Sequence, residues 1–200
     1  MSEQKLYHVA VVGATGAVGE QMIRMLESRN FPVGELKLLS SARSAGTKLK
    51  FRGREYTVQE AGPDSFEGVE IALFSAGSDV SRKLVPHAAA AGAVCIDNTS
   101  AYRMDPETPL VVPEVNPEQI ARHKGVIANP NCSTIQMVAA LKPLHDRYGI
   151  ARIIVSTYQA VSGAGARAVT ELLRQTEELL AGRKPEPDVL PVSSLPVKHQ

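Results

Sequence analysis

The stretch from Tyr7 to Ser28 constrains the fold more than any other part of the sequence. Tyr7–Val12 is a mostly apolar, β-branched run, typical of a strand buried on both faces of a parallel sheet. Gly13–Gly19 follows with glycines three residues apart, and Glu20–Ser28 carries apolar residues at helical spacing. A strand, a glycine turn and a helix in this order favour dinucleotide binding, because the turn lets the backbone approach a pyrophosphate at the helix N-terminus.

The glycine pattern leaves a second interpretation open. Its spacing is G-x-x-G-x-x-G rather than the commoner G-x-G-x-x-G. A turn of this kind can also serve only to pack a strand tightly against the helix that follows it. The prediction of dinucleotide binding therefore depends on the strand–turn–helix context and not on the glycines alone.

Strand-like and helical runs alternate to about residue 150. Strands are expected at Glu35–Ser40, Ile71–Ser75, Val94–Asp97 and Gly125–Ala128, a hairpin at Lys48–Gln59, and helices at Asp79–Ala91 and Ser133–Tyr148. This order predicts an α/β fold built on a Rossmann-type parallel sheet. Beyond it the rhythm breaks, and we expect a strand of a different sheet at Ala151–Gln159, an amphipathic helix at Arg167–Leu180 and an extended tail from Gly182 to Gln200.

The segment after the second expected strand indicates which dinucleotide the fold binds. An NAD-specific fold usually carries Asp or Glu about 20 residues past the glycines, where the carboxylate binds the ribose 2′-hydroxyl. Ser40–Gly46 has no carboxylate and places Arg43 among hydroxyl side chains. A guanidinium suits a 2′-phosphate, so the sequence predicts NADP(H). The alternative is a solvated loop rich in turn residues.

Cys132 is the residue best placed for covalent chemistry. It lies between the strand-like run Gly125–Ala128 and the helical run Ser133–Tyr148, so we expect it at a helix start. Unpaired backbone N–H groups and the helix dipole there favour the thiolate, which is the nucleophilic form of cysteine. Such a cysteine can attack a carbonyl and hold an acyl group. The alternative is a small apolar side chain without chemistry, which is the interpretation that fits Cys95 in its apolar run.

Arg103 is a candidate anion-binding residue. It follows the expected strand Val94–Asp97, and ligands collect at the carboxyl ends of strands in α/β sheets. A guanidinium in that position can bind a phosphate or a carboxylate through two hydrogen bonds. The local sequence is equally compatible with an exposed loop arginine.

Composition and charge exclude several classes of function. The net charge is +1, which favours neither nucleic acid nor an anionic membrane as a partner, and no apolar stretch approaches the ~20 residues of a membrane span. The N-terminal residues lack the layout of a signal peptide. Two cysteines in unlike settings indicate no disulfide and a reducing cytoplasm, and no Cys/His cluster has the spacing of a metal site, so no metal is expected.

Five segments together resemble the aspartate-β-semialdehyde dehydrogenase family, in the family's order and along nearly the whole chain. They are Gly13–Gly19, Ser41–Gly46, Pro113–Asn116, Asn129–Thr134 and Tyr158–Gly165. The resemblance implies a Rossmann-type NADP-binding domain, residues 1–131. It also implies that residues 132–200 are the first part of an α+β mixed-sheet catalytic and dimerisation domain.

The resemblance also implies the reaction and the partners. The family reduces L-4-aspartyl phosphate to L-aspartate 4-semialdehyde with NADPH and releases phosphate, through a cysteine acyl-thioester. This step belongs to the biosynthesis of diaminopimelate and lysine, methionine, threonine and isoleucine. The expected partners are therefore this small-molecule substrate and phosphate, with no nucleic acid and no membrane. A homo-oligomer, a dimer, is expected for the complete protein.

Site residues carry over by motif. Cys132 would be the nucleophile, and Gln159 would orient the substrate beside it. Arg103 and Asn131 would bind the substrate or its phosphate. The residues that would contact NADP(H) are Gly13, Thr15, Gly16, Ala17, Val18, Arg43, Ser44, Ser162 and Gly163.

One departure from the family pattern concerns acid/base chemistry. In the family, a histidine acid/base and a substrate-binding arginine lie in a segment later than Gln200, and none of the five histidines here stands in a matching motif. We therefore expect a truncated chain that binds NADP(H) weakly and turns over little or no substrate. Two alternatives stay open, an enzyme like N-acetyl-γ-glutamyl-phosphate reductase and a non-catalytic module that keeps only the fold.

Overall fold

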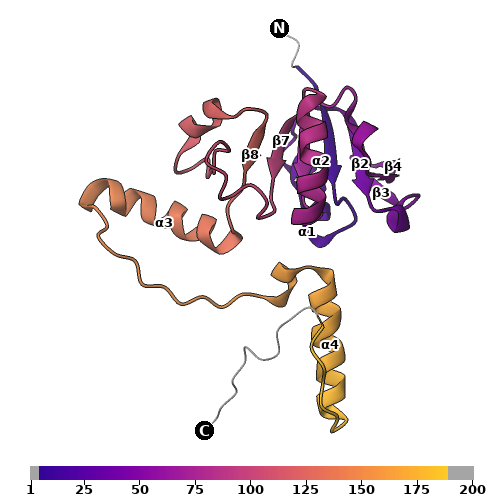
Figure 1. Ribbon diagram of the computed structural model, residues 1–200, viewed down its shortest axis with the longest axis vertical. Helices are drawn as coiled ribbons and strands as arrows, with labels where there is room; N and C mark the ends of the chain where they lie inside the picture. The colour runs from indigo at the N-terminus through magenta and orange to yellow at the C-terminus, as the bar shows by residue number, and fades with distance from the viewer. Residues whose placement is uncertain (1–4, 189–200) are drawn as a thin grey trace. The chain divides into compact units, whose positions relative to one another are not determined.

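The computed structural model describes residues 5–188, and the chain forms two compact units that divide between Val155 and Ser156. The first unit is built on a six-stranded sheet whose order is β5-β2-β1-β6-β7-β8 (Figure 1). Every neighbouring pair of strands in this sheet is parallel. This is the strand order of a dinucleotide-binding Rossmann fold, and the predicted fold class is confirmed.

The elements follow one another with short connections. The strands are β1 (Tyr7–Val12), β2 (Val33–Ser40), β3 (Lys48–Phe51), β4 (Arg54–Thr57), β5 (Gln59–Glu60), β6 (Ile71–Phe74), β7 (Val94–Asp97) and β8 (Val126–Ala128). The α-helices are α1 (Ala17–Ser28), α2 (Ser78–Ala90), α3 (Cys132–Tyr148) and α4 (Ala166–Leu180). Short 3₁₀ helices are η1 (Ala42–Ser44), η2 (Pro63–Phe66), η3 (Pro117–Arg122) and η4 (Val161–Ala164).

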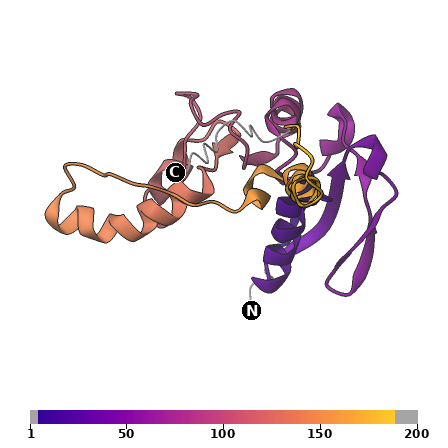
Figure 2. The ribbon, with the colours of Figure 1, turned by 90° about the horizontal axis from the view of Figure 1, so that it is seen from below.

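Strand β1 is buried on both faces, as its apolar run predicts. Val9 and Val11 join a cluster with Ile23 and Leu26 of α1, whereas Ala10 and Val12 join a second cluster that includes residues of α2. Successive side chains of a strand point to opposite faces, so α1 and α2 cover opposite faces of the sheet (Figure 2). The two helices therefore enclose the sheet on both sides and leave its carboxyl-end loops as the place for a ligand.

The predicted hairpin at Lys48–Gln59 forms over only part of its length. β3 and β4 pair in antiparallel register, and Arg52 and Gly53 both have positive φ, as a tight two-residue turn requires. Gln59 and Glu60 leave the hairpin and pair with Leu39 and Ser40 of β2 as the edge strand β5. The hairpin expected over Lys48–Gln59 therefore ends at Thr57, because Gln59 pairs with the edge of the main sheet instead.

The strand predicted at Ala151–Gln159 is not present in the described part of the chain. This stretch carries no strand or helix, and its side chains are exposed, including Ile154 at 88% and Tyr158 at 103%. A strand needs neighbouring backbone to complete its hydrogen bonds. Within residues 5–188 no other segment pairs with it, so the β-branched alternation alone does not make a strand here.

The second unit centres on α4, the predicted amphipathic helix. Ala168 and Glu171 are buried, and the described part of the predicted tail, residues 182–188, is tied to the helix. The backbone N–H of Asp188 donates to Glu171 Oε1 at 2.7 Å, and Arg174 Nη2 donates to the Glu186 carbonyl at 2.7 Å. The expectation for residues 189–200 lies outside the described residues. No helix between residues 5 and 188 has the length and apolar character to cross a membrane.

Candidate functional site

The glycine turn lies at the carboxyl end of β1, between β2 and β6 in the sheet. Chain order reverses at this point, since β2 and β5 lie on one side of β1 and β6, β7 and β8 lie on the other. Open α/β sheets bind ligands in the crevice beyond the strand ends at such a reversal. The candidate cofactor residues Gly13, Thr15, Gly16, Ala17 and Val18 are therefore at the expected place in the fold.

The three glycines have different steric roles. Gly13 has φ +89°, and a Cβ there would lie 2.9 Å from the backbone nitrogen of Ala76 after β6. A Cβ on Gly19 would lie 2.1 Å from the carbonyl oxygen of Gly13. These two glycines are required by backbone packing, which is the second interpretation of the motif. Gly16 is the N-cap of α1, and a Cβ there would meet only the Gly13 carbonyl at 3.3 Å, so backbone N–H groups at this helix start remain open to an anion.

The end of β2 has the chemistry of a 2′-phosphate site. Thr15 Oγ1 and Ser40 Oγ lie 2.8 Å apart and join the glycine turn to the end of β2. Arg43 follows in η1 and is exposed, and its guanidinium has no hydrogen-bond or ion-pair partner among residues 5–188. Ser44 is half-buried beside it. A free cation next to hydroxyls, with no carboxylate from Ser40 to Gly46, fits NADP(H) better than NAD(H).

Cys132 is the first residue of α3, and its side chain is exposed. Asn131 is the N-cap, and its Oδ1 accepts a hydrogen bond from the backbone N–H of Ser133 at 3.0 Å. The preceding Pro130 is buried and fixes the entry of the chain into the helix. The helix start predicted from the sequence is therefore found, with the thiol at a position where backbone N–H groups lack intrahelical partners.

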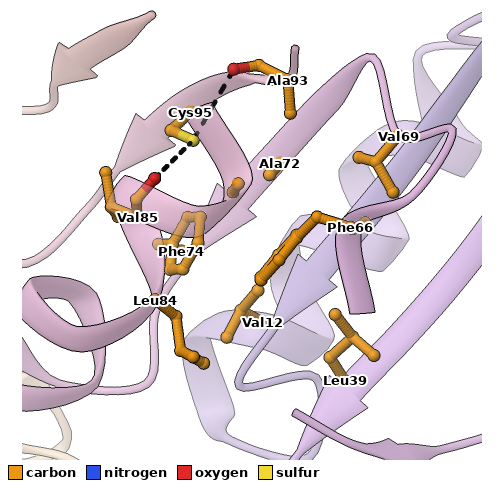
Figure 3. Packing of buried hydrophobic residues seen from close by; sticks show 12 residues of the cluster. Val12, Leu39, Phe66, Val69, Ala72, Phe74, Leu84, Val85, Ala93 and Cys95 are labelled. Atoms are coloured by element: carbon orange, nitrogen blue, oxygen red, sulfur yellow. Dashed lines mark hydrogen bonds between the residues drawn. The ribbon is translucent and has the colours of Figure 1, made fainter. Parts of the chain in front are cut away.

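Cys95 has the opposite setting. It lies in β7 inside the core cluster against α2, and its Sγ is 3.8 Å from the carbonyl oxygens of both Val85 and Ala93 (Figure 3). Burial raises the pKa of the Cys95 thiol to about 12, and the nearby Asp97 carboxylate adds to the rise. The structural role expected for Cys95 is in agreement with this packing.

Arg103 is held beside the chain that leads to Cys132. Its Nε donates to the carbonyl oxygen of Asn129 at 2.9 Å, and its Nη2 donates to the carbonyl oxygen of Asn98 at 3.0 Å. Asn129 lies three residues before Cys132, so the guanidinium is fixed to the same strand–helix turn. Nη1 makes no hydrogen bond or ion pair with any residue between 5 and 188 and is available to an anion.

Asn98 and Asn129 belong to this site although the sequence analysis did not single them out. The Asn129 side-chain Nδ2 donates to Asn98 Oδ1 at 2.5 Å, and the Asn129 backbone N–H donates to the Asp97 carbonyl at 2.8 Å. Each asparagine comes directly after a strand, β7 or β8, and the carboxyl ends of neighbouring parallel strands meet. Polar residues at paired strand ends were the signal that could have found them.

Three candidate residues lie in the second unit and are described within it. A Cβ on Gly163 would lie 2.1 Å from Nε2 of Gln159, so the Gln159 side chain lies directly on this glycine. Ser162 and Gly163 belong to η4, which leads into α4. The roles of Gln159, Ser162 and Gly163 remain predictions.

Two of the described histidines, His123 and His145, bond to nearby backbone groups. His123 Nδ1 accepts from the Gly125 backbone N–H at 3.0 Å, and His145 Nδ1 accepts from the Ile150 backbone N–H at 3.2 Å. His87 is exposed on α2, and His199 lies outside the described residues. Among residues 5–188, no group of three or more His, Cys, Asp or Glu side chains is arranged to hold a metal ion. The expected absence of a metal stays a prediction.

Comparison with known protein families gives two matches along the chain. Residues 8–123 match the family described as "Semialdehyde dehydrogenase, NAD binding domain". Residues 141–194 match the family described as "Semialdehyde dehydrogenase, dimerisation domain". The first match covers the glycine turn, Arg43, Arg103 and the sheet strands up to β7, and the second covers the last eight residues of α3 and all of α4.

Individual proteins agree with these matches. The aspartate-semialdehyde dehydrogenase of Bacillus subtilis is 64% identical over 185 residues, which are 92% of this chain and 54% of that protein. The enzyme of the same name from Aquifex aeolicus is 58% identical over 181 residues, 89% of this chain and 53% of that protein. The chain therefore spans about half the length of the curated relatives it matches.

Solved structures give the same result. The crystal structure of aspartate semialdehyde dehydrogenase II from Vibrio cholerae complexed with ASA matches with a TM-score of 0.89 and 52% identity, over 94% of this chain and 56% of that one. The Candida albicans aspartate semialdehyde dehydrogenase with NADP matches with a TM-score of 0.62 and 30% identity, over 73% of this chain and 48% of that one.

Proposed function

This chain belongs to the aspartate-semialdehyde dehydrogenase family, and from that membership we propose that its protein reduces L-4-aspartyl phosphate to L-aspartate 4-semialdehyde with NADPH. One observation of the structure supports the proposal most directly. An exposed thiol begins a helix, and a guanidinium is hydrogen-bonded to the backbone of the same turn. A nucleophile and an anion-binding group attached to the same turn suit a substrate that carries both an acyl carbon and a phosphate.

The cofactor residues of this chain fit NADPH. The N-terminus of α1 beyond Gly16 would bind the pyrophosphate, with Thr15, Ala17 and Val18 in the same turn. Arg43 and Ser44 would bind the 2′-phosphate, and Ser162 and Gly163 would complete the contacts. When bound, NADPH supplies the hydride that converts the thioester carbonyl to the aldehyde oxidation level.

The chemistry of the first step needs only groups that this chain carries. The Cys132 thiolate attacks the acyl carbon, the new S–C bond forms, and the C–O bond to phosphate breaks as inorganic phosphate leaves. Acyl phosphates are activated, so the departing phosphate needs no strong acid. Arg103 would bind the phosphate and stabilise its charge, and Asn131 would contact the substrate.

The second step releases the product. After reduction, the hemithioacetal on Cys132 collapses, the S–C bond breaks, and the aldehyde leaves with the thiolate restored. Gln159 would orient the substrate during both steps. Backbone N–H groups at the start of α3 are the candidates that would stabilise the negative oxygen of each tetrahedral intermediate.

The wider context is part of the same proposal. Residues 1–131 would serve as the NADP-binding domain and residues 132–200 as the first part of the catalytic and dimerisation domain. The complete protein would be a homodimer, since residues 141–194 match a dimerisation domain. It would act in the cytoplasm, in the biosynthesis of lysine, methionine, threonine and isoleucine, without nucleic acid or membrane partners.

Acylation of Cys132 tests the proposal on the 200-residue chain itself. Incubation with L-4-aspartyl phosphate should release phosphate and add an aspartyl group to the peptide that contains Cys132, as measured by mass spectrometry. Cys132→Ser should abolish the adduct, and Cys95→Ala should keep it. Equal or faster acylation by N-acetyl-γ-glutamyl phosphate would favour the reductase of that substrate, which the names of the matching relatives do not favour. No adduct with either acyl phosphate would favour a non-catalytic module.

A further inference from the structure

Asp97 is a buried carboxylate that the reaction itself does not use. It is the last residue of β7, and its side chain is fully buried. No cation pairs with it within residues 5–188. Burying a carboxylate is costly unless hydrogen bonds satisfy its oxygens. The donors that satisfy Asp97 therefore show what the carboxylate holds in place.

Two of the three donors to Asp97 come from Thr99. The backbone N–H of Thr99 donates to Asp97 Oδ1 at 3.1 Å, and the Thr99 hydroxyl donates to Oδ2 at 2.8 Å. The third donor is the hydroxyl of Ser81 in α2, at 2.8 Å from Oδ1. Thr99 Oγ1 also accepts from the backbone N–H of Ala101 at 3.2 Å. Asp97 and Thr99 together fix the first half of the loop that leads to Arg103.

The other half of the loop depends on this fixed conformation. Arg103 reaches the Asn98 carbonyl on its own loop and the Asn129 carbonyl on the neighbouring strand end. The Asn98 side chain bonds to Asn129 as well. If the backbone around Asn98 rotates, the acceptor of Nη2 and the partner of Asn129 move together. The guanidinium would then lose its fixed distance from the turn that carries Cys132.

We propose that Asp97 is a positioning residue, which acts through Thr99 to fix the Asn98–Arg103 loop and so keeps the Arg103 guanidinium beside the Cys132 turn. The inference rests on the proposed role of Arg103 as the phosphate-binding group. Asp97 itself touches neither substrate nor cofactor in this arrangement. Its contribution is geometric, because a phosphate site needs its guanidinium held in one orientation.

The proposal is tested by the alkylation of Cys132 with two reagents that differ in charge. Iodoacetate is an anion and iodoacetamide is neutral. The rate with iodoacetate divided by the rate with iodoacetamide therefore rises with the positive charge near the sulfur, and this quotient is the ratio compared between variants. Loss of stability alone lowers the melting temperature but does not select between the reagents. Thr99→Val removes the hydroxyl at nearly constant volume and should lower the ratio several-fold. Thr99→Ser keeps the hydroxyl and should leave the ratio at the wild-type value.

Two further variants separate positioning from simple packing. Asp97→Asn presents an amide to the Thr99 hydroxyl and should lower the ratio in the same direction as Thr99→Val. Ser81→Ala removes a hydrogen bond to the same carboxylate from the α2 side and should lower the melting temperature while leaving the ratio unchanged. If Thr99→Val fails to fold, Asp97→Asn and Thr99→Ser still give the comparison, since both keep the shape of the site.

Arg103→Ala distinguishes the two ways in which the inference can fail. A ratio that falls in Arg103→Ala but stays at the wild-type value in Thr99→Val and Asp97→Asn overturns the inference and leaves the proposed function standing. A ratio that stays unchanged in Arg103→Ala shows that the guanidinium does not contribute to the positive charge near the Cys132 sulfur. The proposed role of Arg103 then fails as well. A fall in all three variants, with Ser81→Ala unchanged, supports the positioning role.

Discussion

At the scale of single residues, the two cysteines show how setting decides the chemistry of one side chain. Cys132 is exposed at the first position of α3, whereas Cys95 lies in β7 and is buried against α2. Burial favours the neutral thiol of Cys95 and raises its pKa to about 12, so the thiol is protonated near neutral pH. The reactivity of this chain toward thiol reagents should therefore belong to Cys132.

Alkylation measures this difference directly. Iodoacetamide at pH 7 to about 9 should label Cys132 and leave Cys95 unlabelled, because the folded pKa of Cys95 lies well above this window and its sulfur is enclosed. Peptide mass mapping identifies the labelled residue, and urea should open Cys95 to labelling. Labelling of Cys95 at the rate of Cys132 in the native protein would contradict the packing described for β7.

Arg43 is expected to decide between the two dinucleotides. Arg43→Ala should weaken NADP(H) binding by about ten- to a hundred-fold, equivalent to the ~1.5–3 kcal/mol of hydrogen bonds to a charged group, and should leave NAD(H) binding nearly unchanged. Fluorescence titration with both cofactors measures the two affinities. Arg54→Ala, an exposed arginine on β4, removes the same charge and is the control. Equal losses in both variants would mean that Arg43 contributes only net charge.

At the scale of elements, the glycine turn combines positions required for packing with a helix start proposed to bind the cofactor. Gly13 and Gly19 allow backbone contacts that no side chain permits, and Gly16 leaves the start of α1 uncovered. Packing accounts for Gly13 and Gly19, and the binding role of Gly16 stays a prediction. The side chains of Thr15 in the turn and Ser40 in β2 are hydrogen-bonded, so a change in the conformation of the turn should move the residues of the proposed 2′-phosphate site.

Substitution of the glycines should separate the two roles. Gly19→Ala places a Cβ against the Gly13 carbonyl and should lower the free energy of unfolding by ~1–3 kcal/mol, as overpacking does. Gly16→Ala meets only a 3.3 Å contact and should cost less than ~1 kcal/mol at an N-cap. Urea unfolding measures both. Equal stability of the two variants would show that the turn relaxes around Gly19.

At the scale of the whole molecule, the chain combines a sheet with core clusters on both faces and a second unit with exposed apolar side chains. The clusters on the two faces of the sheet are formed entirely by residues of the first unit. On α4, Leu172, Leu173 and Leu179 are exposed at helical spacing. The first unit should therefore carry most of the stability of this chain.

Turnover by these 200 residues is expected to be low. None of the five histidines stands in the family's acid/base motif, and His123 and His145 bond to nearby backbone groups. Loss of a general acid/base typically costs about 10²–10⁴-fold in rate, so steady-state reduction should run at less than about 1% of the rate of a full-length relative. The Bacillus subtilis enzyme, assayed under the same conditions, is the reference. Comparable rates would refute the prediction.

The sequence by itself determined the parts of this protein that local patterns specify. The apolar run before Gly13, the glycine spacing and the helical periodicity were enough for β1, the turn and α1. The helical run after Cys132 was enough to place the start of α3 within one residue, because periodicity acts within a few residues, whereas the structure showed that Asn131 is the cap. The absence of a carboxylate from Ser40 to Gly46 was likewise readable without coordinates.

Only the tertiary structure decided which distant residues meet. Gln59 and Glu60 join β2 rather than the hairpin, and Ala151–Gln159 stays unpaired although its alternation is typical of a strand. Asn98, Arg103 and Asn129 come together because β7 and β8 are neighbours in the sheet. The physical reason is the same in each case: strand pairing and side-chain hydrogen bonds join groups far apart in the chain, and no local pattern records the partner.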